Sequence, residues 1–153
     1  MKNIATIIVF CTVLGMQNLS AQNLNALRNQ YIQAISKKSV CESLIEHLRQ
    51  KPYKSSIHLA YIGTLEAIWA KYVLNPFSKL QTFKKGKEKI EQAVRQEPHN
   101  IEIRYLRLSV QKNVPGFLGY NDKIEEDELF LKNNLNKVSS EYLRKMIENI
   151  LKG

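Results

Sequence analysis

The chain has 153 residues, of which 44% are hydrophobic and 24% charged, and it carries a formal net charge of +9 at pH 7. This length fits one domain whose core is large enough to fold without covalent staples, so two domains are not expected. A basic charge favours contact with anionic surfaces through long-range attraction, but it specifies no partner.

The first segment of the chain has the layout of a secretory signal peptide. Lys2 precedes the apolar run "IATIIVFCTVLGM", and the more polar "QNLSAQ" follows. We expect a signal peptide over residues 1–21 and one domain over residues 22–153. The apolar run is too short to span a bilayer comfortably, and no second long apolar stretch follows, so no transmembrane segment is expected in the mature chain. The sequence therefore predicts an exported protein, periplasmic or secreted.

Removal of that segment leaves 22 basic and 14 acidic residues, a net charge of +8. Such a protein is suited to anionic surfaces such as membrane headgroups or acidic polysaccharide, and nucleic acid is not expected as a partner of an exported protein. Cys11 leaves with the signal, so Cys41 has no cysteine to pair with. We interpret Cys41 as a buried thiol that behaves as a small hydrophobe; a reactive nucleophile is the alternative.

Helical periodicity dominates from residue 23 onward. Apolar side chains spaced by about 3.6 residues predict a first amphipathic helix over residues 23–36. Ser39 and Glu42 have the spacing of a capping box, which predicts a second helix that ends near Lys51.

The third and fourth helices are separated by an Asn-Pro pair. Ser55 or Ser56 can cap a third helix that runs to about Leu74 and is apolar on two sides. Pro76 then opens the fourth helix, which ends before Pro98. Six side chains of that helix are expected to point inward: Phe77, Leu80, Phe83, Ile90, Ala93 and Val94.

The middle of the fourth helix contains the run "KKGKEK" at 84–89, which we interpret as a solvated helix face rather than an anion-binding site. Gly86 costs about 1 kcal/mol relative to Ala in a helix interior, so we interpret it as the mark of a close helix crossing. Asn100 can cap a fifth helix over 101–113, whose apolar residues keep to no narrow face. We expect that helix to be central and largely buried.

A loop is predicted at 114–121, "VPGFLGYN", because one proline and two glycines interrupt the periodicity. Asp122 and Glu125 form a capping pair for a sixth helix, and Ser139 or Ser140 starts the last one. Seven helices then account for nearly every residue, which predicts an all-α single domain.

Two stretches, "HLRQKPYK" at 47–54 and "AVRQEPHN" at 93–100, share the same residue order and lie 46 residues apart. Alignment of Pro52 with Pro98 also aligns apolar positions in both flanking helices. Each unit would be a helical hairpin that stacks on its neighbour. Chance similarity of two amphipathic hairpins is the alternative.

The segment "KIEQAVRQEPHNIEIRYLRL" at 89–108 resembles the junction between two tetratricopeptide repeats, with Ala93 in the small-residue position and Pro98 in the turn between repeats. The resemblance implies stacked helical hairpins. The chain departs from the family's pattern because the spacing exceeds the usual ~34 residues and the early Trp-Leu-Gly-Tyr signature is missing. The whole chain is also similar to small exported proteins of Bacteroidetes-type bacteria of unassigned function, which implies export and no activity.

No catalytic, cofactor-binding or metal-binding residue is predicted. His47, His58 and His99 are scattered, without the pairing that a metal site needs. The glycines of "PGFLGY" lack a preceding strand and the Gly-Lys-Ser/Thr ending of a phosphate loop. The acidic run "EEDE" at 125–128 suits the N-terminal end of a helix dipole, which is a structural use.

The sequence favours an exported, non-catalytic interaction protein that binds a protein or peptide partner. Phe117, Leu118 and Tyr120 are the candidate partner-binding residues, because they are large apolar side chains in a loop. In the alternative interpretation of this loop they pack against the fourth and fifth helices. The alternative function is an enzyme or a binder of a small anionic ligand, with a pocket lined by Arg104, Tyr105, Arg107 and the histidines.

Overall fold

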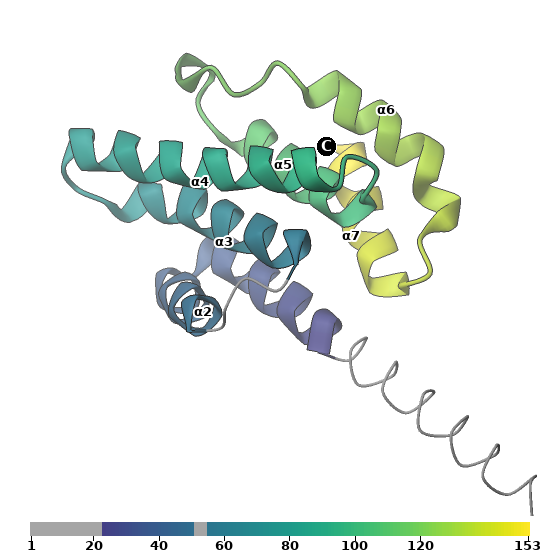
Figure 1. The fold of residues 1–153 in the computed structure, drawn as a ribbon, viewed down its shortest axis with the longest axis horizontal. Coiled ribbons are helices and arrows are strands. Elements are labelled where there is room, and N and C mark those ends of the chain that lie inside the picture. Colours follow the sequence, from purple (N-terminus) through teal and green to yellow (C-terminus); the bar gives the residue numbers. More distant parts are fainter. Residues whose placement is uncertain (1–22, 51–54) are drawn as a thin grey trace, which may run out of the picture.

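The computed structural model describes residues 23–50 and 55–153. Within these two ranges the chain forms seven α-helices and no strand, which confirms the predicted all-α class. An N-terminal helix over residues 23–36 precedes the labelled elements of Figure 1. These are α2 (Lys38–Arg49), α3 (Ser56–Trp69), α4 (Pro76–Gln96), α5 (Ile101–Asn113), α6 (Ile124–Asn134) and α7 (Glu141–Lys152), with short 3-10 turns at Ala70–Tyr72, Gly116–Leu118 and Leu135–Lys137.

Two predicted features involve residues that the structure does not describe. The signal segment 1–21 and the turn at Pro52 lie outside the described ranges, so the signal and the equivalence of Pro52 with Pro98 stay predictions. In the described part of the chain, no helix is long and apolar enough to cross a membrane.

Four of the predicted helix starts are confirmed by side-chain caps. Ser55, Asn75, Asn100 and Ser140 each accept a hydrogen bond from a backbone N–H in the first turn of the helix that follows. Such bonds satisfy amides that have no partner inside the helix. Pro76 occupies the first turn of α4, where its missing N–H costs nothing.

Two predicted caps are wrong. Ser39 lies inside α2, because only Lys37 separates α2 from the preceding helix and backbone hydrogen bonds continue across it, from Lys37 N to Gln33 O and from Cys41 N to Lys37 O, each 3.0 Å. Asp122 also makes no cap, since α6 begins at Ile124 with Lys123 in the cap position.

Helix α5 is the central element, as predicted. Ten consecutive residues, Glu102 to Gln111, are buried. Figure 1 shows α3 and α4 on one side of α5 and α6 and α7 on the other, and α5 contacts all four. Because a helix surrounded in this way is buried on all sides, the polar side chains on each of its faces need hydrogen-bond partners from the neighbouring helices.

Helices α3 and α4 cross at two glycines. A Cβ atom placed on Gly63 would lie 2.7 Å from the carbonyl oxygen of Gly86, and one placed on Gly86 would lie 2.6 Å from the backbone nitrogen of Ala67. The two backbones are therefore in direct contact. This confirms the close helix crossing predicted at Gly86.

The first turns of α4 differ from the prediction. Phe77 and Leu80 were expected to point inward, but their side chains are 76% and 39% exposed. Within the described residues, Leu80 borders an open cavity instead of a packed neighbour, and Phe77 is mostly exposed to solvent.

The glycine crossing yields a test. Gly86→Ala raises helix propensity by about 1 kcal/mol at an ordinary helix position. Here we expect net destabilisation by about 1–3 kcal/mol, because the added methyl group collides with backbone atoms that cannot rotate away. The free energy of unfolding from denaturant titration measures this. Gly116→Ala is the control, since a Cβ there meets nothing within 4 Å. A Gly86→Ala protein as stable as the wild type would contradict the close contact.

Candidate functional site: an apolar cavity beside α5

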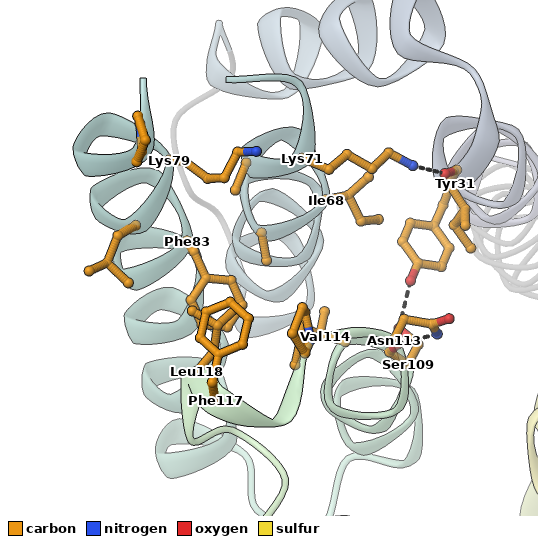
Figure 2. A pocket seen from close by; sticks show the side chains of 17 residues that line it. Tyr31, Ile68, Lys71, Lys79, Phe83, Ser109, Asn113, Val114, Phe117 and Leu118 are labelled. Carbon is orange, nitrogen blue, oxygen red and sulfur yellow. Dashed lines mark hydrogen bonds between the residues drawn. The ribbon is translucent and has the colours of Figure 1, made fainter. Parts of the chain in front are cut away.

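A cavity of about 640 Å³ lies between the N-terminal helix, α3, α4, α5 and the loop that follows α5. This volume is within the range of small-molecule sites. Figure 2 shows the side chains that surround it. The lining is mostly apolar and consists of Tyr31, Ile35, Ala67, Ile68, Ala70, Lys71, Pro76, Lys79, Leu80, Phe83, Ser109, Val110, Asn113, Val114, Pro115, Phe117 and Leu118.

The hydroxyl groups at one edge of the cavity are already hydrogen-bonded to the protein. Tyr31 Oη lies 2.6 Å from Ser109 Oγ, which donates to the carbonyl oxygen of Leu106 at 2.8 Å. Burial raises the pKa of Tyr31 above its usual range, so the phenol stays neutral. Asn113 Nδ2 donates to the backbone oxygen of Ser109 at 2.7 Å. At this edge, therefore, neither hydroxyl group has a hydrogen left to donate to a ligand.

The charged groups of the lining are two lysines. Lys71 Nζ donates to the backbone oxygen of Ile35, and it lies 4.8 Å from the ring centroid of Tyr72. Lys79 is exposed, and its ammonium group makes no hydrogen bond or ion pair within the described ranges. No Asp or Glu is among the lining residues. The cavity therefore has a positive edge with no acid of its own to neutralise it.

The three predicted partner-binding residues have different environments. Phe117 is 88% exposed at the cavity, so packing of this ring into the core is excluded. Leu118 is half-buried and lines the cavity. Tyr120 is buried, with its ring 6.0 Å from that of Phe83 and its hydroxyl donating to Glu91 Oε1 at 2.7 Å. The structure therefore leaves Phe117 and Leu118 accessible to a ligand, while Tyr120 anchors the loop to α4.

Arg104 and Arg107 are not among the lining residues of this cavity, and both pair with Asp127 of α6. Arg107 donates from Nε and Nη2 to the two carboxylate oxygens, each at 2.7 Å, and Arg104 donates from Nε. Gln111 adds a fourth donor at 3.0 Å. Asp127 lies in the first turn of α6, as the run "EEDE" predicted, but it is fully buried and pairs with the two arginines, which the sequence did not predict.

A second buried charge cluster forms around Glu102, the second residue of α5. Arg28 of the N-terminal helix donates to both carboxylate oxygens of Glu102, at 2.8 and 2.6 Å, and Tyr61 donates to Oε1 at 2.6 Å. Burial alone lowers the pKa of Arg28, but the hydrogen bonds and charge of Glu102 outweigh it and raise the pKa. Together these contacts join the N-terminal helix, α3 and α5. They serve the fold and do not reach the cavity.

The remaining candidate chemical groups are also occupied or dispersed. Cys41 is buried with Sγ 3.6 Å from the carbonyl oxygen of Leu65, and burial raises the pKa of the thiol to about 11, so it is protonated at neutral pH. His58 Nε2 lies 3.2 Å from Leu48 O, and His99 stacks on Phe130 with 6.5 Å between centroids. Across residues 23–50 and 55–153, no three His, Cys, Asp or Glu side chains converge as a metal site.

Sequence reasoning did not find the cavity. Its walls come from five segments, and most of its lining residues were correctly placed on helices without any sign that they surround open space. The nearest signal was the apolar loop at 114–121, which does form one wall. No protein-family model, curated protein or solved structure matches the chain, so the resemblance to tetratricopeptide repeats stays an expectation.

The Asp127 cluster predicts a large effect of a small substitution. Asp127→Asn removes the negative charge and leaves two buried guanidinium groups without their main partner, so we expect a loss of about 3–5 kcal/mol in the free energy of unfolding. Chemical denaturation measures this loss. Glu125→Gln, an exposed change in the same acidic run, should stay within about 0.5 kcal/mol of wild type. Equal stability of the two variants would contradict a structural role for Asp127.

Proposed function

We propose that this protein is a non-catalytic binding protein and that the cavity is its binding site for an apolar ligand. The observation that carries the proposal is an open, mostly apolar cavity of about 640 Å³ beside the hydrophobic core. A ligand there removes apolar surface from water, which is favourable.

The lining residues support binding more than catalysis. Catalysis needs a nucleophile or an acid–base pair within reach of a substrate. In this cavity the two hydroxyl groups bond to each other, the phenol is neutral, and the charged groups are lysines. None of the three histidines and no carboxylate lies in the lining.

The site in this proposal belongs to an exported protein, either periplasmic or secreted. The predicted signal at residues 1–21 supports export. The positive net charge supports proximity to anionic surfaces, where apolar and amphiphilic molecules are available.

Binding of a neutral apolar dye such as Nile red tests the proposal. We expect saturable binding with increased fluorescence. Leu80→Ser removes apolar surface from the cavity wall and should weaken binding by about 1–2 kcal/mol, roughly 5- to 30-fold. Leu129→Ser is the matched control, because Leu129 is exposed on α6 outside the lining and should leave dye affinity unchanged. Both variants should melt like wild type. Equal dye affinity of all three proteins would contradict the site.

A protein or peptide partner is the second candidate function, and the exposure of Phe117 favours it. Aromatic side chains dominate the binding energy of many protein interfaces. The Phe117 ring is 88% exposed beside an apolar cavity. It can therefore insert into a pocket on a partner protein, while a side chain of the partner occupies the cavity. The predicted helical-hairpin architecture supports the same function.

The Phe117→Ala variant tests whether the Phe117 ring stabilises the fold or binds a partner. Because the ring is exposed, we expect an almost unchanged melting curve. A photo-crosslinking amino acid at position 117 should yield one recurrent partner by mass spectrometry, and the same amino acid at position 129 should not. A lowered melting temperature of Phe117→Ala would show that the ring packs in the fold. Identical products from both positions would contradict a partner site at Phe117.

A further inference from the structure

The next inference rests on the proposed function and concerns the chemical class of the ligand. We propose that the cavity selects an anionic amphiphile, a long-chain carboxylate whose head group pairs with Lys71 and Lys79 and whose chain fills the apolar interior.

The first step of the argument is the position of the charges. Figure 2 shows Lys71 and Lys79 along one edge of the cavity, with Ser109, Asn113 and Val114 at the opposite edge. Apolar side chains of α3, α4 and the loop after α5 line the space between them. A ligand that matches this arrangement has its charge at one end and an apolar body behind it.

The second step is the supply of hydrogen-bond donors. An ammonium group has three donors. Lys71 uses one of them on the Ile35 carbonyl oxygen, and Lys79 uses none within the described ranges. A carboxylate has two acceptor oxygens, each of which can accept a charge-assisted hydrogen bond from a lysine ammonium group. No acidic side chain of the lining competes with it.

The third step concerns the hydroxyl groups at the edge of the cavity opposite the lysines. The hydroxyl hydrogens of Tyr31 and Ser109 are used, because Tyr31 contacts Ser109 and Ser109 donates to Leu106 O. The far end of the ligand therefore needs no polar group, and a methyl-terminated chain fits. A cationic head group would be repelled by both lysines, and a neutral one could accept a hydrogen bond from a lysine but would gain no ion pair.

A series of three amphiphiles with the same twelve-carbon chain tests the proposal on the purified chain. Dodecanoate, dodecanol and dodecyltrimethylammonium carry a negative, a neutral and a positive head group. Each is titrated as a competitor of Nile red below its own aggregation concentration. We expect dodecanoate to bind about five- to tenfold more tightly than dodecanol, and dodecyltrimethylammonium to bind most weakly. The preference for dodecanoate should decrease in 1 M salt because the head group is near solvent.

The variants assign that preference to the two lysines. In the Lys71→Gln, Lys79→Gln protein we expect dodecanoate to lose its advantage while dodecanol affinity stays the same. The Lys84→Gln, Lys85→Gln protein has the same net charge, but its changes lie on the exposed side of α4 outside the cavity, so it should keep the full preference. If loss of the Lys71 bond to Ile35 disturbs folding, Lys79→Glu tests the same edge, because the ammonium group of this exposed residue makes no bond within the described residues; it should also reduce the preference for dodecanoate.

The outcomes separate this inference from the function on which it rests. Equal affinities of dodecanoate and dodecanol for the wild type, or the same preference in the Lys71→Gln, Lys79→Gln protein, would overturn the anionic ligand class while the apolar site stands. Failure of Nile red and of all three amphiphiles to bind would overturn the binding site itself, and the ligand class with it.

Discussion

The structure depends on the burial of charged side chains on its central helix. Helix α5 carries Glu102, Arg104 and Arg107 within a run of ten buried residues. Buried charges cost several kcal/mol each unless they are paired and hydrogen-bonded. The elements around α5 must therefore supply countercharges at fixed positions. Arg28 of the N-terminal helix meets Glu102, and Asp127 of α6 meets both arginines.

This constraint determines which helices pack together and on which side. Purely apolar helices can slide or rotate against each other at modest cost, whereas a two-point contact between Arg28 and Glu102 fixes distance and orientation. Burial alone lowers the pKa of Arg107, but the hydrogen bonds and charge of Asp127 raise it, so the arginine stays a cation in the fold. With these charges committed to neighbouring helices, the cavity is left with mostly apolar walls from the same domain.

The sequence predicts the helices well because their signals are local. Periodicity and caps such as Asn75 and Asn100 act within a few residues, and they identify nearly every helix correctly. What packs against each helix face, in contrast, depends on residues that are distant in the sequence. Nothing near Asp127 in sequence distinguishes it from its exposed acidic neighbours, because its burial depends on arginines 20 and 23 residues away. In the same way, the pattern identifies the face of Leu80 but not the open space in front of it.

The glycine crossing of α3 and α4 has a consequence for how such a protein can evolve. Two residues that border the cavity lie one helical turn from this crossing, Ala67 after Gly63 and Phe83 before Gly86. A change in the separation of the two backbones moves both walls at once, although neither glycine lines the cavity. The size of the cavity can therefore be altered by mutation at positions that do not line it. A change in cavity size and the stability of the fold depend on the same two codons, so each limits the other.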